Sequence, residues 1–196
     1  MATETDIANL ALSHFGQDAS IDSIDPPDGS VEAEHAQRFL PIARDEILEA
    51  FPWSFSKRRA TLAELVNDRD DWAYRYAVPA GCIKPRIVLP EGYDDEETEG
   101  ATFDWQGDSL YTDEPNATLV YSYRVTDPTK FTPLFTTSLS WRLASYMSGP
   151  IVKDPTGRVQ AALYQRSEVE LRKAMASNAN ASRSRATHTP TASRVR

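Results

Sequence analysis

Hydrophobic residues recur at helical spacing in four stretches of the chain, two in its first quarter and two in its last third. In the second stretch they form one continuous stripe, which consists of Ala36, Phe39, Leu40, Ala43, Ile47, Leu48 and Phe51. Such spacing places the side chains on one face of an α-helix. With capping residues such as Ser30 and the pair Asp154-Pro155, the pattern predicts helices at about 4–16, 31–51, 133–148 and 155–176.

Between about residues 53 and 125 the period of the pattern changes toward two. Leu119, Tyr121 and Tyr123 alternate with other residues, as is typical of a strand with one buried and one wetter face. Shorter runs at 72–76, 86–89, 103–105 and 110–111 are similar. We therefore expect an α+β fold, in which a helical bundle of about four helices carries a small antiparallel β-sheet insertion of four or five strands.

A hinge is predicted where the second helix meets this insertion. Pro52 cannot continue a helix and disfavours the helical conformation for the residue before it. Trp53 and Phe55 should then leave the helix in an extended conformation, with both rings on one face. We expect these aromatic side chains to be buried and to fasten the sheet to the helices.

The charge of the chain is unevenly distributed. The formal net charge is −8, but residues 177–196 contain no acid and four arginines: Arg183, Arg185, Arg194 and Arg196. The rest of the chain holds all 29 acidic residues and 17 basic ones, a net charge of −12. Because the last segment has almost no large apolar side chain, we expect a domain at 1–176 followed by a flexible basic docking tail at 177–196. An acidic body argues against wrapping DNA and suits a surface past which DNA slides.

No pattern in the sequence points to a metal, a cofactor or a catalytic site. The three histidines, His14, His35 and His188, lie outside any metal-binding spacing, and no phosphate-binding loop or nucleophile elbow occurs. The acidic run at 91–99 departs from a calcium-binding loop at its key positions. Cys82 is the single cysteine, and no apolar run approaches the length of a membrane span. With an acidic start instead of a basic leader, we expect a soluble protein made in the cytoplasm that is not an enzyme.

Several local signatures, in the same order, resemble the head-to-tail adaptor family of tailed bacteriophages, also called tail tubular protein A. They cover about residues 7–176 and read Ile7-Ala-Asn-Leu-Ala-Leu-Ser-His-Phe-Gly16, Ala43-Arg-Asp-Glu-Ile-Leu-Glu-Ala-Phe-Pro-Trp-Ser-Phe55, Trp72-Ala-Tyr-Arg-Tyr-Ala-Val-Pro79, Gly107-Asp-Ser-Leu-Tyr-Thr-Asp113 and Tyr121-Ser-Tyr-Arg-Val-Thr-Asp-Pro128. A helix with Leu139, Arg142, Leu143 and Ala144 follows. Where family members often carry an acidic residue before a cysteine, this chain has Gly81-Cys82.

This resemblance implies a structural protein of the virion neck, synthesised in the host cytoplasm. Family members form a ring, here expected to hold twelve subunits, between the phage portal protein and the tail nozzle or tail-tube protein. DNA passes through the channel without specific binding. By analogy the helices pack the ring, the sheet faces the next tail component, and the arginine-rich tail docks against the portal. The family supplies no catalytic residue.

Two other function classes remain open at this point. A virion-associated peptidoglycan hydrolase would need a pair of carboxylates in a cleft, and the spacing of the acidic residues selects no such pair. A sequence-independent DNA-binding module would use the arginine tail, and its binding would depend steeply on salt.

Overall fold

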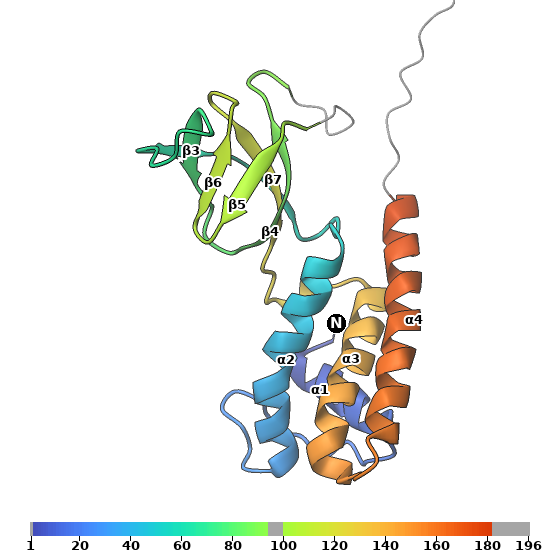
Figure 1. Cartoon of the computed structure of the whole chain (residues 1–196). Coiled ribbons are helices and arrows are strands. Elements are labelled where there is room, and N and C mark those ends of the chain that lie inside the picture. Colours follow the sequence, from blue (N-terminus) through green and yellow to red (C-terminus); the bar gives the residue numbers. More distant parts are fainter. Residues whose placement is uncertain (1, 94–99, 182–196) are drawn as a thin grey trace, which may run out of the picture.

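The computed structural model describes residues 2–93 and 100–181, and this part of the chain combines α-helices with two small antiparallel sheets. The helices are α1 (Glu4–Ser13), α2 (Val31–Ala50), α3 (Pro133–Val152) and α4 (Arg158–Ala181), with a short 3-10 helix, η1 (Pro128–Lys130). Figure 1 shows the helices at one end of the molecule and the sheets at the other. The mixed composition agrees with the predicted α+β class.

Seven strands form the two sheets, more than the four or five expected. They are β1 (Lys57–Thr61), β2 (Ala63–Leu65), β3 (Tyr74–Ala77), β4 (Cys82–Leu89), β5 (Phe103–Gln106), β6 (Ser109–Thr112) and β7 (Thr118–Tyr123). One sheet has the order β1-β7-β4 and the other β2-β3-β6-β5. The strands that the sequence missed, β1 and β2, are mostly exposed edge strands, so they lack the apolar alternation by which a half-buried strand is recognised.

The central strand of the first sheet differs from its prediction. The alternation in β7 indicated one buried and one wetter face, but all residues from Leu119 to Ser122 are buried. β7 pairs with β1 on one side and with β4 on the other, and it also contacts α2. A strand in this position is covered on both faces, which is why Val120 and Ser122 are enclosed as well as Leu119 and Tyr121.

α2 begins at its predicted capping residue, whereas α4 begins at Arg158, three residues after the start that Asp154-Pro155 predicted. Thr3 and Asp6 form a reciprocal capping box at the start of α1, and the Ser30 hydroxyl accepts a hydrogen bond from the Ala33 N–H at the start of α2. Thr132 caps α3 in the same way. Asp154 accepts from the Val159 N–H, so it caps the turn before α4 although the helix itself begins at Arg158.

Three helix ends lie away from their predicted positions. α1 ends at Ser13, three residues early, and the chain turns through Gly16 in a left-handed conformation. α3 continues past Pro150 to Val152 and ends at Lys153, which adopts the left-handed conformation. α4 continues to Ala181, five residues past its predicted end at 176. The last turn of α4 is helical although it contains few large apolar side chains.

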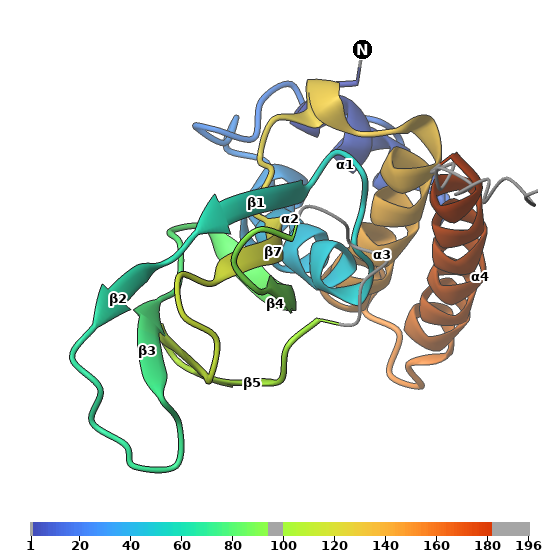
Figure 2. The ribbon, with the colours of Figure 1, turned by 90° about the horizontal axis from the view of Figure 1, so that it is seen from above.

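Two hydrophobic clusters correspond to the two ends of the molecule. The larger one joins the four helices, and α3 supplies Phe135, Leu139, Leu143 and Met147 to it, each with no exposed surface. Figure 2, viewed from above, shows α3 between α2 and α4, and α3 also contacts α1. The smaller cluster fills the space between the sheets. Within the described residues, no helix combines the length and the apolar character needed to cross a membrane.

The predicted hinge joins these two ends through its aromatic rings. Phe51 ends α2 in an extended conformation, with φ −147° and ψ 147°, as Pro52 requires. Trp53 is fully buried, donates from Nε1 to the Ile47 carbonyl at 2.8 Å, and packs edge-on against Phe135 at 5.1 Å. Phe55 is half-buried and also contacts Phe135, at 4.9 Å. The burial of Trp53 is confirmed.

The backbone of the hinge is not extended as predicted. The N–H groups of Ser56 and Lys57 both donate to the Trp53 carbonyl at 2.9 Å, so residues 53–57 form a tight turn. The turn brings Trp53 and Phe55 to the same side, with ring centroids 6.1 Å apart. The rings share a face, as expected, because of the turn and not because of strand alternation.

We predict that Trp53→Ala lowers the free energy of unfolding by about 3 to 5 kcal/mol, since it removes a large buried ring and leaves a cavity. Urea unfolding followed by circular dichroism measures this. Trp105→Ala is the matched control, because Trp105 is 42% exposed on β5 and should cost less than about 1 kcal/mol. Equal losses in the two variants would contradict the assigned role of Trp53.

Candidate assembly interface

The structure brings the three predicted hinge residues together and leaves the predicted docking residues outside its description. Pro52, Trp53 and Phe55 lie at the junction of α2, α3 and β1. Arg183, Arg185, Arg194 and Arg196 lie outside the described residues, as does most of the acidic run at 91–99. The docking role of these arginines therefore stays a prediction.

A residue that the sequence assigned to the tail instead fastens α4 to the hinge. Asn178 is buried, and its Oδ1 accepts hydrogen bonds from the Ser54 N–H at 3.2 Å and from the Ser54 hydroxyl at 3.1 Å. The available signal was spacing, because Asn178 continues the buried series of Leu171 and Ala174 along α4. The end of α4 thus belongs to the folded core.

A buried arginine in the middle of α3 links three helices. Arg142 is 1% exposed and forms ion pairs with Glu46 of α2, at 2.5 Å, and with Glu168 of α4. Its guanidinium carbon lies 4.2 Å from the centre of the Tyr164 ring. Sequence analysis placed Arg142 on a helix but did not identify this network, since pairing between distant helices leaves no local pattern.

The surroundings of Arg142 favour the charged form of its guanidinium group. Burial acts to lower the pKa of the Arg142 guanidinium, but the nearby Glu46 and Glu168 carboxylates, with Tyr164, raise it above its ordinary value. The Tyr146 hydroxyl donates to Glu46 Oε2 at 2.5 Å. Burial and this hydrogen bond raise the pKa of Tyr146 to about 12. Arg142 and Tyr146 therefore each keep one protonation state at neutral pH, which suits a fixed structural connection.

A second connection, which holds α1 on α3, is sensitive to pH. The His14 ring stacks on Trp141 with centroids 3.6 Å apart and planes 6° apart, and its Nε2 lies 2.9 Å from the Ser140 hydroxyl. Arg166 of α4 lies over the same Trp141 ring at 5.5 Å. Burial and the positive charge of Arg166 lower the pKa of His14 to about 4, although Glu170 acts in the opposite direction.

The face of α4 that points away from α3 is exposed and mixes small apolar with basic residues. Ala162, Val169 and Ala176 follow one another at seven-residue intervals along it, and Val169 is 42% exposed. The buried series of α4 runs along the other side, through Leu163, Ser167, Glu170, Leu171, Ala174 and Asn178. We call the exposed series the α4 outer face.

A second exposed helix face lies on the opposite flank. Val31 and Ile42 of α2 are 58% and 54% exposed, and Glu34 and Arg38 share their side of the helix. We call this series the α2 outer face. α2 carries five acidic and two basic residues, whereas α4 carries four basic and two acidic ones. Figure 1 shows α2 and α4 on opposite flanks of the helical part.

A scan against protein-family models and a search of curated proteins found no match to this chain. Within residues 2–93 and 100–181, the His, Cys, Asp and Glu side chains form no cluster of three or more that could hold a metal ion. The features of the described residues that bear on function are the exposed faces of α2 and α4 and the contacts that fix these helices in place.

We predict that Arg142→Ala lowers the free energy of unfolding by about 3 kcal/mol or more, because it leaves two carboxylates of the helix junction without their partner. Chemical unfolding followed by tryptophan fluorescence measures this. Arg124→Ala is the matched control: Arg124 pairs with Asp45 at 2.8 Å, but its side chain is half exposed, so its loss should cost less than about 1 kcal/mol. A similarly small loss in the Arg142 variant would show that the network does not hold the helices.

We predict that stability falls as the pH drops from about 6.5 toward 4, in part through His14. In the unfolded chain a histidine takes up its proton near pH 6.5, whereas folded His14 takes it up only near pH 4. Between these values the unfolded state binds more protons, so acid favours unfolding. His14→Phe keeps a ring against Trp141 and should flatten this part of the profile in urea titrations at several pH values. Profiles of the same slope would exclude His14 as a cause.

Proposed function

We propose that this protein is a structural head-to-tail adaptor of a tailed bacteriophage virion, which forms a ring between the portal and the tail nozzle or tube. The observation that carries the proposal is the pair of exposed helix faces on opposite flanks of the helical part, one on a helix with more acidic residues and the other on a helix with more basic ones. The ordered signatures shared with the adaptor family support the same function.

Two different faces on opposite flanks suit a cyclic assembly. When one patch of a subunit binds a different patch of the next, the contact is heterologous, and it closes into a ring if the rotation per subunit allows it. The α4 outer face offers Val169 on a helix with more basic than acidic residues, and the α2 outer face offers Ile42 on a helix with more acidic than basic ones. Apolar contact at the centre with complementary charges around it favours this pairing over self-pairing of either face.

In this assembly the two ends of the subunit have separate tasks. The four helices act as the bundle of the adaptor fold and pack the ring of twelve copies. The sheets reach toward the tail nozzle or tail-tube protein, and the tail with Arg183, Arg185, Arg194 and Arg196 docks against the portal. The net charge of −12 outside the tail keeps the channel wall from holding DNA as it passes. The virion neck is the proposed location.

We predict that the protein is a monomer or weak oligomer alone and forms rings when its portal is added, since docking of the tail raises the local concentration of subunits. Light scattering and negative-stain imaging with and without portal test this. A stable monomer in both conditions would contradict the adaptor function.

Val169→Glu should then weaken ring formation on the portal by about tenfold or more, because it would bury a charge at the centre of the contact. Val66→Glu is the control, since Val66 is 88% exposed in the loop between β2 and β3, away from both helix faces. If both variants form rings as well as the parent protein, the α4 outer face does not join the subunits.

A further inference from the structure

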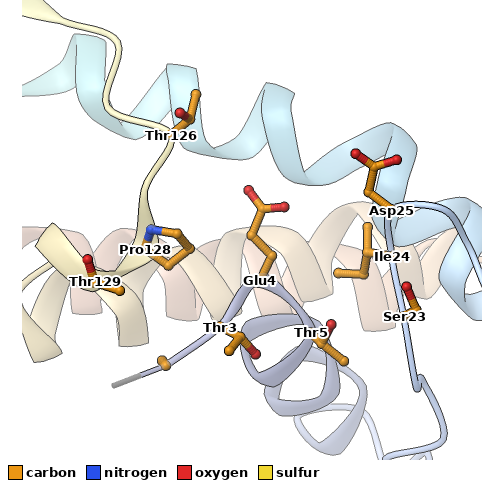
Figure 3. Close-up of a pocket in the computed structure, with 10 residues that line it drawn as sticks. Thr3, Glu4, Thr5, Ser23, Ile24, Asp25, Thr126, Pro128 and Thr129 are labelled. Carbon is orange, nitrogen blue, oxygen red and sulfur yellow. The ribbon is translucent and has the colours of Figure 1, made fainter.

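Three adjoining hollows form a path across one side of the helical part. The first, about 390 Å³, lies between the start of α1, residues 23–25 and residues 126–129 (Figure 3). The second, about 360 Å³, shares Ala2, Pro128 and Thr129 with the first. The third, about 210 Å³, shares Pro133 with the second. We call this path the N-terminal groove.

The described part of the chain ends inside this groove. Ala181, the last residue of α4, lines the third hollow together with Asn178 and Ser54. Residues 182–196 continue from that point, and 15 residues can span about 50 Å when extended. The segment is therefore anchored at one end of the groove and has enough length to follow it.

Charge at the far end of the groove complements this segment. Glu4 and Asp25 line the first hollow, and Figure 3 shows their side chains on α1 and on the loop before α2. The half-exposed Glu4 carboxylate lies 3.7 Å from the Arg44 guanidinium, so an arginine of the segment would share it with Arg44. That loop, residues 17–29, contains four aspartates and no basic residue. The segment 182–196 contains four arginines and no acid, with Arg194 and Arg196 at its end.

The middle of the groove also fits the middle of the segment. Phe131, Pro128 and Pro133 line the second hollow, which is the most apolar of the three. Residues 186–192 of the chain hold alanine, threonine and proline besides one histidine, so most of their side chains are small. A narrow apolar groove accepts such a segment without large rearrangement.

We propose that, in the free protein, residues 182–196 lie back along the N-terminal groove of the same molecule, with Arg194 and Arg196 against Glu4 and Asp25. This inference goes beyond the adaptor function and does not require it. The arginines then contact carboxylates of their own molecule until a partner competes for them. Docking of this segment to a partner would therefore begin with its release from the groove.

A spin label on the segment tests the proposal in the full chain. In a Cys82→Ser background, a nitroxide at Val195→Cys should broaden the amide signals of residues 3–5 and 23–25 more than those of the sheets. The broadening should weaken at high salt, because ionic contacts on a surface are screened. Uniform broadening over the whole surface would overturn the proposal.

Mixing two protein samples distinguishes contacts within one molecule from contacts between two copies. Isotope-labelled protein without nitroxide is mixed with spin-labelled protein that carries no isotope, so only contacts between copies broaden signals. The proposal expects no broadening of residues 3–5 and 23–25 in this mixture. Broadening as strong as within one molecule would assign the groove to a neighbouring copy and overturn the contact in cis.

Two double variants that remove the same amount of charge test whether ionic contacts hold the segment in the groove. Glu4→Gln with Asp25→Asn should reduce the paramagnetic effect at the groove at least about twofold, whereas Glu64→Gln with Asp70→Asn, exposed acids at the sheet end, should leave it unchanged. Circular dichroism checks that each variant is folded, and Asp25→Asn alone replaces the double variant if that one is not. An unchanged effect in the folded groove variant would overturn the proposal.

Discussion

The arrangement of the helices depends on one buried charge, the guanidinium of Arg142 in the middle of α3. Removing such a group from water is costly unless carboxylates meet it with good geometry. Glu46 of α2 pairs with Nη1 and Glu168 of α4 pairs with Nη2, and the Tyr164 ring lies against the guanidinium. An arrangement that displaced either helix would take away one of the two carboxylates that pair with this charge. The ion pairs therefore select one packing of α2, α3 and α4, while the apolar contacts around Phe135 supply most of the stabilisation.

This packing decides which surfaces remain available for other molecules. With Leu163, Leu171 and Ala174 turned toward α3, the opposite side of α4 presents Val169 among basic residues. α2, which carries more acidic than basic residues, presents Ile42 on the other flank. The same packing places the last turn of α4 beside the hinge and next to the start of α3. The proposed ring contact and the N-terminal groove are thus both consequences of how α4 is held.

Local patterns predicted the parts of the fold that local physics controls. Helical spacing and capping located the starts of α1, α2 and α3, and Pro52 ended α2 where expected. The end of α4 was missed because Asn178 is ordered by a contact with Ser54, 124 residues away in sequence. The Arg142 network was missed for the same reason. Of the candidate site, the sequence predicted the hinge residues and the basic segment, but the outer faces of α2 and α4 emerge only once the packing of α3 is known.

The central claim is that the α4 outer face of one subunit meets the α2 outer face of the next in a ring. Its most direct test is disulfide trapping in the portal complex, with Cys82→Ser, Ile42→Cys and Val169→Cys in one chain. Mild oxidation should then produce a ladder of crosslinked species up to the closed ring, and either engineered cysteine alone should produce none. Rings seen by electron microscopy without any crosslinked ladder would show that other surfaces join the subunits and would contradict the claim.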